Sequence, residues 1–116
     1  MNIESYRDFC IRMHAVTEEF PFDNKTLVFT AAGKMFTLTD VDEFQSINLK
    51  CDSEIAIGRR DQHTAVPPGY HMNKKHWNTV TIEGSISDQE LEAWIIGGYE
   101  LMVSGLTNKQ REEAGF

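Results

Sequence analysis

The stretch TLVFTAAGKMFTLT, residues 26–39, decides the fold, because it holds two strand-forming segments separated by a very short connection. TLVFTA (26–31) and KMFTLT (34–39) are both rich in β-branched and aromatic residues. Ala32 and Gly33 leave only two residues between them, which is the length of a hairpin turn. The stretch therefore predicts an antiparallel β-hairpin.

Further strands are expected on both sides of this hairpin. QSINLK (45–50) and WNTVTIE (77–83) alternate polar and apolar residues, as a strand with one buried face does. VTEEFPF (16–22) precedes the hairpin, and its Pro21 limits it to an edge strand or an extended connection. An antiparallel meander is the simplest arrangement of these segments.

Two helices are predicted outside the meander. Residues 2–13 begin with Asn2, a favoured N-cap, and carry apolar side chains at spacings of three and four. Asp52 and Ser53 are both suitable N-caps for a short helix over about 54–62. That helix cannot continue through the Pro-Pro-Gly that follows it, which indicates an extended loop and turn.

A long helix is predicted after the last strand. Ser87-Asp88-Gln89-Glu90 is a capping box, and the apolar residues after it continue at helical spacing. We expect Leu91 and Trp94 to be buried against the sheet, and Gly97-Gly98 to allow close packing there. Gly105 stands where a left-handed C-cap is expected.

Thr107 with Gln110 forms a second capping box, which predicts a short terminal helix. The expected order is α-β-β-β-β-α-β-α-α, in one domain over 1–116. This order predicts an α+β fold, with an antiparallel sheet of four to five strands and helices packed on one face. It is not the alternation of a doubly wound nucleotide-binding fold.

Composition narrows the class of protein. Of the 116 residues, 41% are hydrophobic and 25% are charged, as in ordinary soluble domains. The N-terminus has neither the basic nor the apolar region of a secretory signal, and no apolar run is long enough to span a membrane. We therefore expect a cytoplasmic monomer with no membrane contact, whose Cys10 and Cys51 are reduced thiols.

Charge is distributed unevenly along the chain. The net charge is −7, which disfavours nucleic-acid binders as a class. Yet residues 58–80 carry a net charge of +3, from four basic residues and one acidic residue, and the remainder carries −10. The positive segment contains the most unusual stretch of the chain, PPGYHMNKKHWNTV (67–80).

This stretch combines cations, amide donors and aromatic rings and contains no acidic residue. Such groups contact phosphates and stack on bases in nucleic-acid-binding proteins. The alternative is a polar turn whose Tyr70 and Trp77 anchor it to the core while Lys74 and Lys75 lie in water. Residue types alone leave both interpretations open.

Metal and catalytic sites are not predicted. The gap of five between His71 and His76 fits neither the i, i+4 pairing of a zinc helix nor one face of a strand. Cys51 could act as a nucleophile only with a lowered pKa, which the adjacent Asp52 opposes. Phosphate-binding and nucleophile motifs are absent from the sequence. We expect no cofactor, no catalytic residue and no metal.

The chain resembles the MmcQ/YjbR family of small bacterial proteins. The likeness is carried by VTEEFPF (16–22), TLVFTAAGKMFTLTD (26–40), NLKCD (48–52) and, most specifically, PPGYHMNKKHWNTV (67–80). The resemblance implies a CyaY-like fold. It also implies DNA binding, because the family is commonly labelled DNA-binding on the likeness of its fold to a double-wing arrangement. The family often has proline after LKCD, where this chain has Ser53, which affects only how the short helix starts.

Two functions follow as hypotheses. The first is a non-enzymatic DNA-binding protein, whose weak, salt-sensitive contacts come from the turn and nearby cations: His71, Asn73, Lys74, Lys75, His76, Trp77, Asn78, Lys50, Arg59 and Arg60. The second is a small-molecule-binding or resistance-type protein with a pocket near the same turn, lined by His71, His76, Trp77 and Cys51. The first requires the cations to share one face, away from the acidic clusters, and the second requires a concave apolar pocket.

Overall fold

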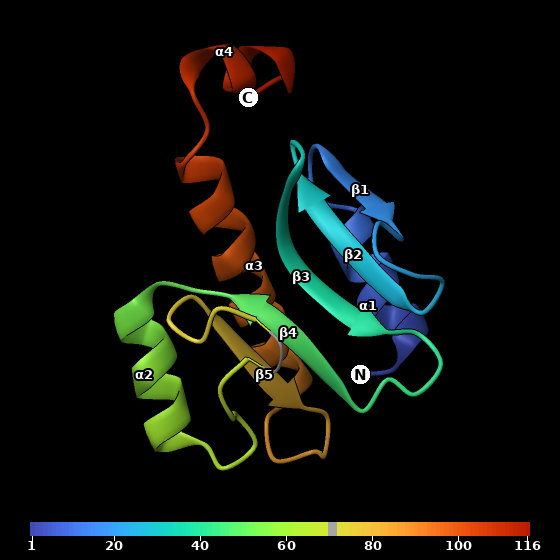
Figure 1. The fold of residues 1–116 in the computed structure, drawn as a ribbon, viewed down its shortest axis with the longest axis vertical. Coiled ribbons are helices and arrows are strands. Elements are labelled where there is room, and N and C mark those ends of the chain that lie inside the picture. Colours follow the sequence, from blue (N-terminus) through green and yellow to red (C-terminus); the bar gives the residue numbers. More distant parts are fainter. Residues whose placement is uncertain (70–71) are drawn as a thin grey trace.

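The computed structural model describes residues 1–69 and 72–116. Within them, five strands form one antiparallel sheet in the order β1-β2-β3-β4-β5, with four helices (Figure 1). The strands are β1 Val16–Glu19, β2 Thr26–Ala31, β3 Lys34–Asp40, β4 Ser46–Lys50 and β5 Trp77–Thr81. The helices are α1 Ile3–Ile11, α2 Ser53–Gln62, α3 Asp88–Ser104 and α4 Asn108–Glu113. The predicted α+β class and element order are confirmed.

The predicted hairpin is formed by β2 and β3. Ala32 and Gly33 have φ of 49° and 86°, so both turn residues adopt the left-handed conformation that matches the twist of a two-residue hairpin. Ala31 pairs with Lys34 directly across the turn. β1 pairs with β2 and lies at the edge of the sheet, and Pro21 falls beyond its end.

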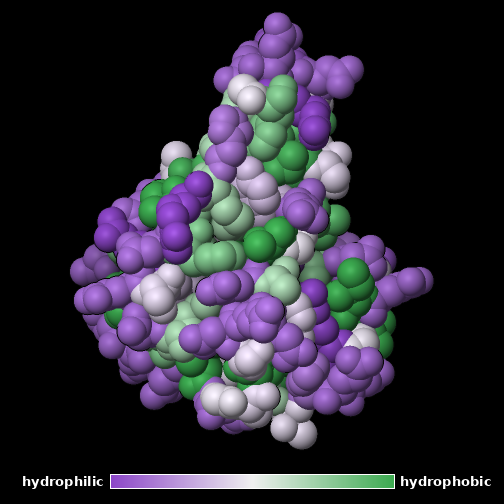
Figure 2. All heavy atoms as spheres, turned by 180° about the vertical axis from the view of Figure 1, so that it is seen from behind, coloured by the Kyte–Doolittle hydropathy of each residue, from purple (hydrophilic) through white to green (hydrophobic). Residues whose placement is uncertain are grey.

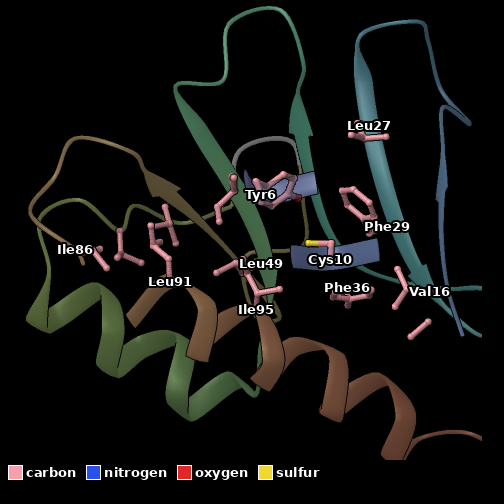
Figure 3. Close-up of a cluster of buried hydrophobic side chains, with 14 of the residues drawn as sticks. Tyr6, Cys10, Val16, Leu27, Phe29, Phe36, Leu49, Ile86, Leu91 and Ile95 are labelled. Atoms are coloured by element: carbon pink, nitrogen blue, oxygen red, sulfur yellow. The ribbon is translucent and has the colours of Figure 1, made fainter. Parts of the chain in front are cut away.

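Helices α1 and α3 cover one face of the sheet (Figure 1). Side chains from both helices and from the strands fill the space between these layers (Figure 3). The Tyr6 hydroxyl and Thr37 Oγ1 share a buried hydrogen bond of 2.8 Å, which ties α1 to β3. On the opposite face a smaller apolar cluster contains Val28, Leu38 and Trp77.

Helix α3 lies very close to the sheet at one point. A Cβ atom on Gly98 would be 2.8 Å from the carbonyl oxygen of Lys50 and 3.3 Å from that of Phe36. The expected close packing therefore involves Gly98. A Cβ atom on Gly97 would meet nothing nearer than an Arg59 nitrogen at 4.0 Å, so Gly97 takes no part in this packing.

Leu91 is buried against the sheet as expected, but Trp94 is only partly buried and faces α2. Its ring lies 5.2 Å from that of His63, at the end of α2. The expectation for Trp94 therefore holds only in part, because its side chain packs against the core cluster but is not fully buried. Three residues along a helix turn the side chain by about 300°, which places Trp94 on the stripe next to that of Leu91.

The helix ends agree with the sequence except at Gly105 and at Ser87, where only the Ser87 half of the predicted capping box forms. The predicted capping box at Thr107 and Gln110 is complete, and Ser87 caps α3 by accepting from the N–H of Glu90. Gly105 has φ of −87°, so the expected left-handed C-cap is wrong. Its N–H instead donates to the Met102 carbonyl, which tightens the last turn of α3.

Figure 2 shows the helix-covered side of the molecule, where apolar side chains reach the surface between hydrophilic ones. The projecting tip in this view contains α4 and is mainly hydrophilic. No helix in the described part of the chain is both long enough and apolar enough to cross a bilayer.

Candidate functional site

The basic turn before β5 is held by its own backbone. Asn73 Oδ1 accepts a hydrogen bond from the Lys75 N–H at 3.0 Å, and the Asn73 carbonyl accepts one from the Trp77 N–H at 3.0 Å. Asparagine commonly forms such local turns. Lys74 and Lys75 are exposed on this frame. The turn therefore presents two cations without using them for its own stability.

Trp77 and Asn78 anchor the turn beneath these lysines. Their exposed fractions are 4% and 1%, so they have little surface left to offer a ligand. The Asn78 amide donates to the Ala56 carbonyl of α2 at 3.1 Å, and Lys50 Nζ lies 5.1 Å from the centre of the Trp77 ring. Both were proposed as contact residues, but in the structure they position the turn against β4 and α2.

Two further cations lie beside the turn. Arg60 Nη1 donates to the Lys74 carbonyl at 3.0 Å, which joins the end of α2 to the turn. Lys50 pairs with Trp77 across β4 and β5, and the N–H of the next residue donates to the His76 carbonyl at 2.9 Å. We call the four residues Lys50, Arg60, Lys74 and Lys75 the basic end of the sheet.

The acidic turns lie at the other end of the strands. Asp40 pairs with Thr26 where β3 ends and β2 begins, and Asp42 and Glu43 follow it before β4 starts at Ser46. β4 then runs to Lys50, and at about 3.4 Å per residue this strand separates the two ends by about 14 Å. The acidic turn over residues 40–43 and Lys50 at the basic end are therefore separated by the length of β4.

Asp23 belongs to the same acidic end. Its carboxylate accepts hydrogen bonds from the N–H groups of Lys25 and Thr26 at 2.9 and 2.7 Å, just before β2 begins. These backbone hydrogen bonds lower the pKa of Asp23, so it stays charged at neutral pH.

Arg59 is separated from the basic end. Its guanidinium carbon lies 4.6 Å from the centre of the Trp94 ring, in a groove between α2 and α3. The sequence did not show this separation, because neighbouring residues on a helix diverge by about 100° and Arg60 takes the other direction. The predicted set of cations thus divides into two sites.

The groove between α2 and α3 is the hollow to compare with the small-molecule pocket of the second hypothesis. One hollow in it has a volume of about 350 Å³ and is lined by Cys51, Asp52, Ile55, Arg59, Gly97, Glu100, Leu101 and Ser104. Of the predicted pocket residues it contains Cys51, whereas His76 and Trp77 do not line it. His71 and Tyr70 lie outside the described residues.

Sequence reasoning missed most of the groove, although a signal for it exists. Asp52, Ile55 and Arg59 follow one another at helical spacings of three and four, and so do Trp94, Gly97 and Leu101. Each set forms one stripe of its helix. Only the tertiary structure shows that the two stripes face each other.

The family assignment rests on similarity along most of the chain. The YjbR family model matches residues 11–101. The uncharacterized protein YbdF of Escherichia coli O157:H7 is 34% identical over 94 residues, covering 80% of this chain and 77% of that protein. The uncharacterized protein YjbR of Escherichia coli K12 is 26% identical over 113 residues, covering 97% of this chain and 96% of that protein.

Solved structures agree. A Deinococcus radiodurans crystal structure of the DUF419 domain has a TM-score of 0.90 and 34% identity, covering 99% of this chain and 88% of that one. A Pseudomonas syringae crystal structure shares the fold, with a TM-score of 0.74 and 24% identity, covering 88% of this chain and 99% of that one. The chain belongs to the YjbR family.

Proposed function

We propose that this protein is a non-enzymatic DNA-binding protein that contacts backbone phosphates through the basic end of its sheet. The observation that carries this proposal is the grouping of Lys50, Arg60, Lys74 and Lys75 around one anchored turn. Cations that converge on one patch, with the acidic turns at the far end of the strands, create a local positive field on a negative protein.

Phosphates suit this surface better than bases do. Base recognition needs side chains that stack on bases or reach their edges, but Trp77 is buried beneath Lys50. Lys74 and Lys75 are exposed point charges, which contact phosphates with little dependence on sequence. Binding should therefore show little sequence preference.

The affinity is expected to be low. Four phosphate contacts would give a log–log salt slope of at most about −3.6 on duplex DNA, at about 0.9 per contact. The net charge of −7 repels the duplex at longer range. Binding should be visible near 20–50 mM salt and largely lost at physiological ionic strength.

A salt titration of three proteins tests the proposal. Lys74→Ala/Lys75→Ala should flatten the slope by nearly 2 on every DNA sequence tried. The matched control is Lys25→Ala/Lys109→Ala, which removes the same charge from exposed lysines at the acidic end and on α4. This control should keep the wild-type slope. Identical slopes for the two double variants, or no wild-type binding at 20 mM salt, would exclude the turn as a DNA contact.

A further inference from the structure

The groove between α2 and α3 extends beyond a single hollow. A second hollow of about 300 Å³ adjoins the first and shares Ile55 and Arg59 with it. It continues past Trp94 and His63. Each hollow lies near the lower limit of pockets that hold small molecules. Arg59 stands in the middle of this groove.

In the described part of the chain, the guanidinium of Arg59 has no anionic partner. Among residues 1–69 and 72–116 it forms no salt bridge or side-chain hydrogen bond, and its contact is with the face of Trp94. Arg59 is half-buried, and desolvation lowers its pKa below the usual value for arginine. A partly desolvated cation is stabilised when an anion pairs with it.

Gly97 supplies a second, independent observation. Glycine destabilises the interior of a helix relative to alanine, and at Gly98 the contact with the sheet explains its presence. At Gly97 a Cβ atom would have ordinary room, so packing does not require glycine there. The missing side chain leaves the wall of the groove open opposite Arg59.

We propose that this groove binds a small amphipathic anion, with one acidic group paired to Arg59 and an apolar or aromatic body over Ile55, Gly97 and Leu101. Asp52 and Glu100 line the first hollow and Glu90 lines the second, but all three are exposed, so water screens their repulsion of an anion more than it screens the half-buried Arg59.

Cys51 gives the groove an apolar floor without reacting. Burial raises the pKa of its thiol above the usual value for cysteine, so the sulfur stays protonated at neutral pH. A protonated thiol is a poor nucleophile but packs well against an apolar ligand. Binding is therefore expected to be reversible.

A pair of fluorescent probes tests whether the site selects for charge. The anionic probe is 8-anilinonaphthalene-1-sulfonate, and the neutral control is N-phenyl-1-naphthylamine, which lacks the sulfonate. Arg59→Gln should weaken binding of the sulfonate by about tenfold or more, as expected for loss of a charged hydrogen bond. It should change binding of the neutral probe by less than about twofold. Equal losses of affinity for both probes would overturn the proposal, because the arginine would then contribute through the shape of the groove and not through its charge.

A filling variant tests the location. Gly97→Leu adds a better helix former whose side chain occupies the groove, so it should keep the wild-type melting temperature and abolish sulfonate binding. The control is Ile96→Phe, which adds bulk beside a separate hollow between α1 and α3 and should leave binding unchanged. Sulfonate binding that survives in a folded Gly97→Leu protein would exclude this groove.

This inference stands apart from the DNA proposal. Lys74→Ala/Lys75→Ala should leave sulfonate binding unchanged, and Arg59→Gln should leave the DNA salt slope unchanged. Glu100→Gln, which removes a carboxylate from the groove, should tighten sulfonate binding by about twofold, within the range of exposed charge pairs. Weaker binding in this variant would contradict the proposal that the groove binds an anion.

Discussion

Two neighbouring stripes of α3 have opposite surroundings. Leu91 and Ile95 are buried against the sheet (Figure 3), and at Gly98 the sheet backbone leaves no room for a Cβ atom. Trp94, Gly97 and Leu101 lie one stripe away and line the open groove toward α2. The residues of the first stripe are constrained by the stability of the fold, and those of the second stripe are not. This difference arises although residues of the two stripes are close neighbours in the sequence.

The largest expected effect is the difference in stability loss between alanine variants of Ile95 and Ile96. Their exposed fractions are 0% and 38%, so only the first is completely enclosed by core side chains. Ile95→Ala should lower the free energy of unfolding by about 2–5 kcal/mol, through lost burial and the cavity left behind. Ile96→Ala should cost less than about 1 kcal/mol. Urea unfolding of both variants measures the difference, and equal losses would mean that α3 is rotated.

Replacing Gly97 or Gly98 with alanine should change the stability of the protein in opposite directions. Gly98→Ala forces a Cβ atom to within 2.8 Å of the Lys50 carbonyl oxygen, which a rigid strand cannot avoid. It should destabilise the protein by about 1–3 kcal/mol. Gly97→Ala meets no such contact and should stabilise it by up to about 1 kcal/mol. Thermal melts compare the pair, and a loss at both positions would show that Gly97 also packs against a neighbour.

The smallest effect concerns the groove stripe itself. Arg59 and Trp94 should couple by about 0.5–1 kcal/mol, the usual strength of a cation–π pair near the surface. A double-mutant cycle with Arg59→Gln and Trp94→Leu measures this coupling in unfolding experiments. A coupling near zero would show that the ring does not stabilise the guanidinium in solution.

Much of the fold could be predicted, because local rules and tertiary structure agree in most of this chain. Strand alternation and the two-residue turn at Ala32-Gly33 placed the hairpin, and capping residues placed the starts of the helices. The partial exposure of Trp94 was not predicted, because an apolar helical stripe is more than 100° wide. Periodicity cannot say which of its members face the sheet and which face another helix.

The candidate site was harder to predict for a related reason. Charge counting found the basic segment 58–80, and in the structure Arg60 of that segment bonds to the Lys74 carbonyl, while Lys50, from outside the segment, lies over Trp77. Trp77 was misjudged because residue type does not reveal burial, which here depends on pairing with β4. Arg59 and Arg60 are adjacent in sequence, and only the packing of α2 against its neighbours sends them to different sites.

The order of the strands also has a consequence for how the protein folds. Each of β1, β2 and β3 pairs with the next strand along the chain across a short connection, so these hairpins can form early. Residues 51–76 must be enclosed before β5 can pair with β4, and that longer loop closure costs more chain entropy. We expect the basic turn to be completed late. Mutations in it should then mainly speed unfolding, whereas mutations in the β2–β3 hairpin should slow folding.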